Sequence, residues 1–80
     1  MATLSWVKVT GPYDRNVFVN GQYAGPAGKI DVPFRVETGL NTFETLDAGS
    51  IPDWSADAVI TVGHTQTNPQ IVVLEPVAGG

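Results

Sequence analysis

The stretch Asn16–Ala24, NVFVNGQYA, decides the fold that the sequence predicts. Val17 and Val19 alternate with Phe18, which is the two-residue period of a β-strand. Asn20-Gly21 follows, and this pair favours a type I′ turn because both central residues of that turn need a positive φ. Residues 22–24 should then pair back onto residues 17–19. The sequence therefore predicts a β-hairpin early in the chain.

A second alternating stretch follows the hairpin after a loop over residues 25–28. In Lys29–Glu37, KIDVPFRVE, every second residue is apolar, which predicts a strand with one buried face. The apolar positions are Ile30, Val32, Phe34 and Val36. Pro33 on the other face indicates an edge position or a bulge, because proline cannot donate to a β-ladder. Residues 38–41 should form a turn with Gly39 at positive φ.

Four further segments are predicted to be strands: residues 3–10, 41–47, 57–63 and 69–75. In the first of them, Leu4 and Trp6 lie on one face, and Val7 and Val9 lie on the other. Residues 48–56 are predicted to form a loop with one helical turn, because Ser50 is a suitable N-cap and proline two residues later suits the first turn.

These segments predict an all-β fold, a small antiparallel immunoglobulin-like β-sandwich of six or seven short strands. Residues 1–76 should form one domain, and residues 77–80 a flexible C-terminal tail. The abundance of Val, Thr and Ile agrees with strands, whereas Leu, Lys and Glu, which favour helices, are scarce. The aromatic residues expected in the core are Trp6, Phe18, Phe34 and Phe43.

Composition excludes several classes of function. The chain has 80 residues, with 4 Lys or Arg against 8 Asp or Glu, and a formal net charge of −4. An acidic chain is a poor binder of nucleic acid, whose phosphates are neutralised by Lys and Arg. It has no apolar run of the roughly 20 residues that a membrane span needs, so no membrane insertion is expected. Without a signal peptide the chain is expected in the cytoplasm as written, or in the bacterial envelope if it is a trimmed domain.

Residues that could carry catalysis are few. The chain has no cysteine and one histidine, which excludes a thiolate or multi-histidine metal site. His64 should be a turn residue, and no G-x-S-x-G elbow accompanies it. The glycines around residues 21–28 lack the Walker pattern. Asp47, Asp53 and Asp57 fit no EF-hand spacing. We therefore expect no enzyme activity, no metal and no cofactor.

Aromatic residues in or beside turns point instead to binding. Tyr13, Tyr23 and Trp54 could stack on a sugar or anchor a partner protein. The partner is expected to be a protein or a polysaccharide, contacted by these aromatics and by acidic loops. Exposed strand edges would also allow homo-oligomers. Another possible function is that of a small acidic accessory protein, such as a phage inhibitor, that blocks a basic surface.

Residues 17–25, VFVNGQYAG, resemble the hairpin motif of PEGA domains. Residues 32–43, VPFRVETGLNTF, are similar to that family's next strand and turn, and residues 58–62 and 71–74 to its closing strands. The resemblance covers residues 15–76. It implies an immunoglobulin-like sandwich that serves as a non-catalytic binding or spacer module. The chain departs from the family in an insertion at residues 49–56.

The C-terminus also resembles that of ubiquitin-like sulfur carriers. Val77 and Ala78 precede Gly79-Gly80, the last two residues. The resemblance implies that Gly79 and Gly80 are a reactive tail that an activating enzyme modifies. That fold requires a helix directly after the first hairpin, where residues 24–47 hold several Gly and Pro residues and alternate as a strand.

Overall fold

The structure is a computed structural model of the whole chain, and it describes residues 3–12 and 14–77. The described residues form strands, turns and loops but no helix, and hence none that could cross a membrane. The strands are β1 (Leu4–Thr10), β2 (Phe18–Val19), β3 (Gln22–Tyr23), β4 (Phe34–Glu37), β5 (Gly39–Leu46), β6 (Pro52–Ile60), β7 (Gln70–Val73) and β8 (Glu75–Pro76). The all-β prediction is therefore confirmed.

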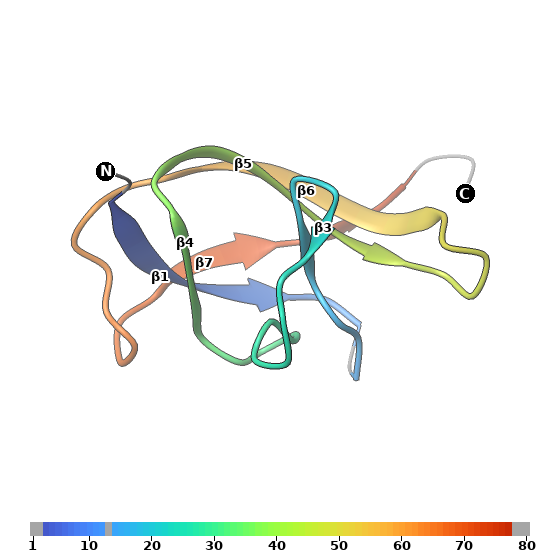
Figure 1. Cartoon of the computed structure of the whole chain (residues 1–80), viewed down its shortest axis with the longest axis horizontal. Helices are drawn as coiled ribbons and strands as arrows, with labels where there is room; N and C mark the ends of the chain where they lie inside the picture. The colour runs from blue at the N-terminus through green and yellow to red at the C-terminus, as the bar shows by residue number, and fades with distance from the viewer. Residues whose placement is uncertain (1–2, 13, 78–80) are drawn as a thin grey trace.

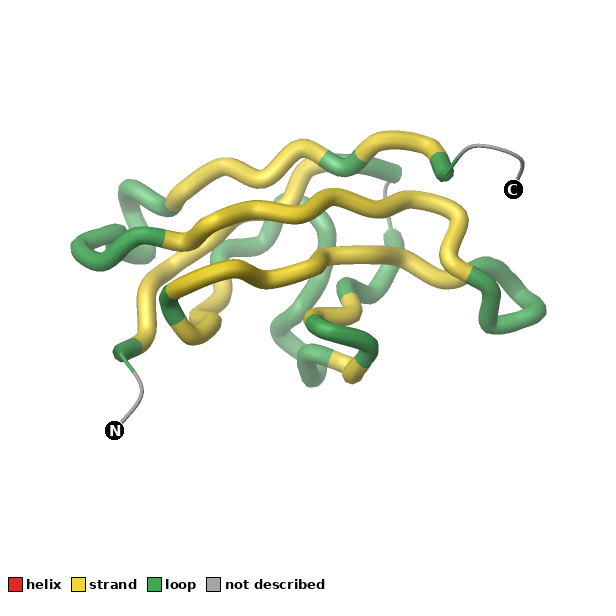
Figure 2. The backbone as a smooth tube through the Cα atoms, turned by 90° about the horizontal axis from the view of Figure 1, so that it is seen from above, coloured by secondary structure: helices red, strands yellow, loops and turns green. Residues whose placement is uncertain are grey.

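The strands form two sheets, and the chain passes between them repeatedly (Figure 1). One sheet has three strands in the order β4-β1-β7, and the other has five in the order β3-β2-β5-β6-β8. The long strands β5 and β6 run side by side along one face (Figure 2). The predicted number of strands was too low, because β2, β3 and β8 have only two residues each.

The sequence predicts antiparallel pairing throughout, but one pair of strands in the structure is parallel. β7 pairs in parallel with β1, with Val9 opposite Val72. β7 follows β6, which belongs to the other sheet, so β7 enters its own sheet by a crossover rather than by a hairpin. A crossover permits a parallel pair, whereas a tight hairpin does not.

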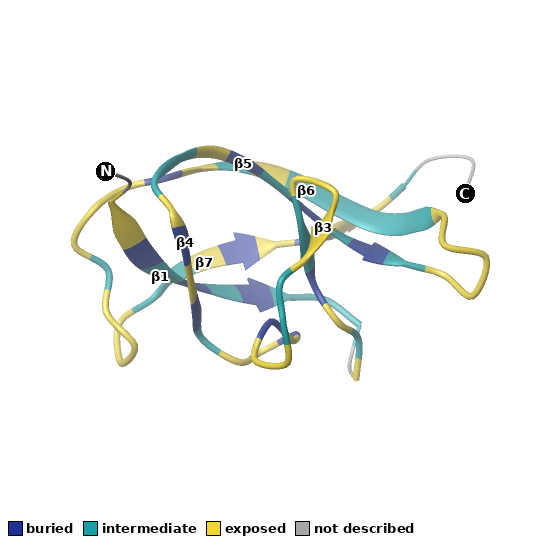
Figure 3. Ribbon diagram, in the orientation of Figure 1, coloured by how far each residue is buried: buried dark blue, intermediate teal, exposed yellow. Residues whose placement is uncertain are grey.

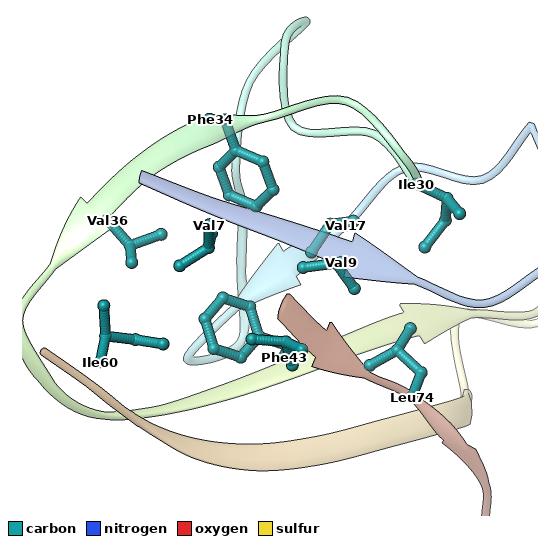
Figure 4. Close-up of a cluster of buried hydrophobic side chains, with 10 residues drawn as sticks. Val7, Val9, Val17, Ile30, Phe34, Val36, Phe43, Ile60 and Leu74 are labelled. Atoms are coloured by element: carbon teal, nitrogen blue, oxygen red, sulfur yellow. The ribbon is translucent and has the colours of Figure 1, made fainter. Parts of the chain in front are cut away.

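The core lies between the sheets and follows the alternation along β1, β4, β5 and β7 (Figure 3). Val7 and Val9 of β1 point toward Phe43 of β5, and Phe34 and Val36 lie beside them (Figure 4). Ile30, Phe34, Val36 and Phe43 are buried, as predicted. Val32 is not, being 41% exposed, because Asp31 at φ 64° interrupts the alternation and β4 starts only at Phe34.

Two turns were predicted correctly. Asn20 and Gly21 have φ of 53° and 81°, as a type I′ turn requires, and Phe18 pairs with Tyr23 across the hairpin. Gly39 has φ 106° where β4 passes into β5. The side chain of Asn41 stabilises this passage, because its Nδ2 donates to the Glu37 carbonyl (2.7 Å) and its Oδ1 accepts from Asn20 Nδ2 (2.8 Å).

The helical turn predicted within residues 48–56 is wrong. Residues 47–51 instead form the turn of the β5–β6 hairpin, in which Asp47 N donates to the Ile51 carbonyl (2.8 Å). Ser50 has φ 62°, which is incompatible with the extended backbone of an N-cap. The Asp47 carboxylate accepts from the backbone N–H of Gly49 and of Ile51, at 2.8 and 3.1 Å. These bonds favour the hairpin over a helix, and β6 begins at Pro52.

Candidate functional site

The outer face of the three-stranded sheet carries an exposed apolar and basic surface, which we call the Trp6 face. Its members are the outward side chains Leu4, Trp6, Lys8, Arg35, Ile71 and Val73, with Thr10 and Glu37 at its ends. The alternation of β1 creates this surface, because Ser5, Val7 and Val9 point into the core. Ile71 is 54% exposed and Val73 63% exposed. Single exposed apolar residues are ordinary, but contiguous ones commonly mark a contact surface.

Trp6 and Arg35 lie side by side on this face, on the central strand β1 and the edge strand β4. They are opposite each other in the β1–β4 register, and the Arg35 guanidinium lies 5.7 Å from the centroid of the indole ring. A guanidinium over an aromatic face is held by attraction to the ring quadrupole. Arg35 is thereby oriented on the surface, where it is exposed to solvent. Trp and Arg are also the residue types that most often dominate binding energy.

A groove of about 520 Å³ lies next to this pair. Its lining includes Leu4, Trp6, Val32, Pro33, Arg35 and Gln66, so it is largely apolar with a cation at its rim. The loop before β4 forms one wall. The groove is open to solvent and would suit one apolar side chain of a partner better than an enclosed small ligand.

The outer face of the five-stranded sheet has the opposite charge, and we call it the acidic face. Its members are Leu40, Thr42, Glu44, Asp57, Val59 and Glu75. Glu44 and Glu75 both lie opposite Ser55, so three neighbouring strands bring the two carboxylates into one row. Leu40 pairs with Val59, and these residues are 71% and 62% exposed. The Thr42 hydroxyl donates to Asp57 Oδ1 (2.7 Å).

The aromatic residues expected to bind a partner lie in different places. Tyr23 is 53% exposed at the hairpin, and its ring contacts that of Phe18, with centroids 5.9 Å apart. Trp54 is not in a loop but in β6, where its half-buried side chain packs against the core. Tyr13 lies outside the described residues. The structure therefore does not bring the three together.

Two aromatic residues that the sequence predicts in the core, Trp6 and Phe18, lie outside it. Trp6 is on the outer face of β1, and Phe18 is half-buried on the outer face of β2. The sequence did contain the signal for Trp6, because the alternation placed it with Leu4 and opposite Val7 and Val9. The prediction that Trp6 is buried rests on the hydrophobicity of its side chain, whereas its position in the strand indicates the outer face.

The three aspartates do not converge on one site. Asp47 stabilises the β5–β6 turn, Asp57 accepts from Thr42, and Asp53 binds Arg15 and Thr45. No cluster of three or more potential metal ligands occurs among residues 3–12 and 14–77. These carboxylates therefore act in separate local contacts.

His64 contacts a hydroxyl rather than a carboxylate. Its Nε2 lies 2.9 Å from Thr61 Oγ1, and its backbone N–H donates to Ser5 Oγ (3.2 Å). Neither Asp57 nor Glu75 is hydrogen-bonded to it in the described part of the chain.

Gly79 and Gly80, the residues of the sulfur-carrier resemblance, lie outside the described residues. The helix which that fold needs would fall within residues 24–47, and these form β4, β5 and connecting turns instead. The described residues therefore lack the helix on which the sulfur-carrier resemblance depends.

The Trp6 face and the acidic face are thus two extended outer surfaces of the described residues. Comparisons of the chain with models of protein families, with curated proteins and with solved structures gave no match.

Proposed function

We propose that the chain is a non-catalytic interaction module with an immunoglobulin-like β-sandwich fold, and that it binds a protein through the Trp6 face. Two sheets around one core, with a chain that passes repeatedly between them, support the sandwich. The observation that carries the function is the Trp6–Arg35 pair on a face that also exposes Leu4, Ile71 and Val73.

The chemistry of this face defines the kind of partner. Leu4, Ile71 and Val73 provide apolar area, and burying it is favourable at about 25 cal/mol per Å². Lys8 and Arg35 lie among them and select against basic surfaces. The partner surface should therefore combine aliphatic side chains with carboxylates.

Selection from a random peptide library tests this proposal. Peptides enriched on the wild-type chain should be rich in Asp, Glu and aliphatic residues, and should lose binding to Trp6→Ser and to Arg35→Ser. Lys29→Ser, which removes a cation from the loop before β4, outside both faces, is the matched control and should retain most binding. Peptides that bind all the variants equally well would exclude the Trp6 face as the site.

A second candidate is polysaccharide binding at the hairpin. The exposed ring of Tyr23 beside Phe18 offers a platform on which a sugar could stack. A glycan array distinguishes the two functions. Signals that disappear in Tyr23→Ala but persist in Trp6→Ser would favour the hairpin over the Trp6 face.

A further inference from the structure

The Trp6 face and the acidic face point away from each other on opposite sides of the core. The inward side chains of both sheets meet in one core (Figure 4). The outward side chains of the two sheets therefore project in opposite directions. The molecule extends over 35 Å and 21 Å along its two longest axes, which sets the scale of both faces.

The two faces are complementary in charge. Lys8 and Arg35 are two of the 4 basic residues in the chain, and both lie on the Trp6 face. Glu44, Asp57 and Glu75 lie on the acidic face without a basic side chain among its members. Glu37, at the end of the Trp6 face beside Leu4, leaves that face with a small positive charge.

The faces are also complementary in their apolar groups. The Trp6 face exposes Ile71 and Val73 on its edge strand, and the acidic face exposes the Leu40–Val59 pair. Apolar contact gives an interface most of its affinity, whereas opposite charges mainly set orientation and partner choice. A second copy thus supplies the surface of aliphatic side chains and carboxylates that the Trp6 face requires.

We infer that the partner of the Trp6 face is the acidic face of a second copy of this chain. The contact is heterologous, since it joins two different faces, and a pair of copies retains one free Trp6 face and one free acidic face. Successive copies therefore add in one direction and form a linear stack rather than a closed dimer. The inference rests on the proposed use of the Trp6 face, but it names the partner.

The net charge of −4 opposes association, so the stack should be weak. We expect a dissociation constant between about 10 µM and about 1 mM, a range accessible to sedimentation velocity. Added salt has two opposing effects, because it screens both the repulsion between whole molecules and the attraction between faces. Charge reversal is therefore a sharper test than salt.

Two charge-reversal variants test the contact. Lys8→Glu/Arg35→Glu makes both faces acidic, and Glu44→Lys/Asp57→Lys makes both faces basic. Each variant alone should lose self-association at least tenfold. A mixture of the two should associate again, because every contact then joins an acidic face to a basic one. Circular dichroism verifies that each variant is folded.

A single substitution provides the matched control. Lys8→Glu and Lys29→Glu change the net charge equally, but Lys29 lies in the loop before β4, outside both faces. Lys8→Glu should weaken association and Lys29→Glu should leave it within about twofold of wild type. This comparison remains decisive if replacement of Arg35 prevents folding.

The inference is overturned if the wild-type chain stays monomeric over the whole concentration range, or if the mixture fails to associate. Peptides selected by the Trp6 face would in that case still support the proposed function, with a foreign partner. Self-association that both charge-reversed variants retain would instead assign the contact to strand edges and exclude face stacking.

Discussion

Arg15 and Asp53, 38 residues apart in the sequence, join the loop before β2 to the start of β6. Arg15 Nη2 donates to both carboxylate oxygens of Asp53, at 3.0 and 2.8 Å, and also to the Leu46 carbonyl. The pair depends on a β-bulge. Thr45 pairs with Trp54 and Leu46 with Pro52, so Asp53 is the extra residue of β6. The bulge allows Asp53 to reach the buried hydroxyl of Thr45, which donates to Oδ1 (2.6 Å).

Asp53→Ala should destabilise the fold by about 1–3 kcal/mol, because the fully buried Thr45 hydroxyl loses its acceptor. Asp57→Ala is the matched control. It removes an acceptor from the Thr42 hydroxyl, which remains accessible to water, and should cost no more than about 0.5 kcal/mol. Urea denaturation of the two variants measures both costs. Equal losses would mean that the bulge contact contributes nothing specific.

The same carboxylate should make stability depend on pH. The hydrogen bond from Thr45 lowers the pKa of Asp53, partial burial opposes that effect, and Arg15 lowers the pKa further. A group whose pKa is lowered by folding stabilises the fold above its ordinary pKa of about 4. That contribution is lost as the pH falls through the lowered pKa of the folded state. Wild type should therefore be more stable than Asp53→Asn near neutral pH, and the difference in Tm should shrink in acid. A difference that is constant from neutral to acidic pH would contradict the lowered pKa.

The hairpin and the buried strand faces could be predicted from the sequence because their causes are local. Asn20-Gly21 specifies its turn through backbone geometry, and the alternation of Val7 and Val9 with polar neighbours specifies which side is buried. The parallel pairing of β1 with β7 could not be predicted, because it depends on the path of the chain between the sheets. The bulge at Asp53 could not be predicted either. It depends on Arg15, which is distant in sequence, and on Thr45, which belongs to the neighbouring strand.

The candidate site was harder to predict than the fold. Trp6 and Phe18 are large and apolar, so hydrophobicity alone assigned them to the core. Each sheet has one inner and one outer face. Phe34, Phe43 and aliphatic residues fill the space between the inner faces, and the rings of Trp6 and Phe18 lie on the outer faces. Residue type does not reveal whether a ring lies on the inner or the outer face of a sheet, whereas strand register does. The alternation in β1 is more informative about Trp6 than its hydrophobicity.

Gly21→Ala should destabilise the hairpin by about 1 kcal/mol, the usual cost of a left-handed conformation for a residue with a Cβ. Nothing lies within 4 Å of the added Cβ, so the cost is backbone strain at φ 81° and not a clash. Gly49→Ala, in the other hairpin turn, is the control. Its Cβ would meet Asp47 Oδ1 at 3.4 Å, and Gly49 is not among the positive-φ glycines. Chemical denaturation should show a loss for Gly21→Ala only, and a larger loss for Gly49→Ala would refute this account.

Gln70 covers the open edge of β6. β8 pairs with β6 only at Trp54 and Ser55, so the last residues of β6 lie beyond the strand that would protect them. The Gln70 side chain takes the place of a neighbouring strand there, since Nε2 donates to the Val59 carbonyl (2.9 Å) and Oε1 accepts from Thr61 N (3.0 Å). Open edges pair readily with other chains, and covering them is a common protection against aggregation.

Gln70→Ala should therefore uncover this edge without disturbing the core. The amide hydrogen of Thr61 should exchange with solvent at least tenfold faster, because its acceptor is removed and a local opening is no longer needed. Gln70→Glu should retain the protection of Thr61, since a carboxylate also accepts, but it should repel the Val59 carbonyl. Gln66→Ala, in the turn before β7, should leave the exchange rate unchanged. NMR-detected exchange separates these cases, and unchanged protection of Thr61 in Gln70→Ala would show that the side chain does not shield the edge.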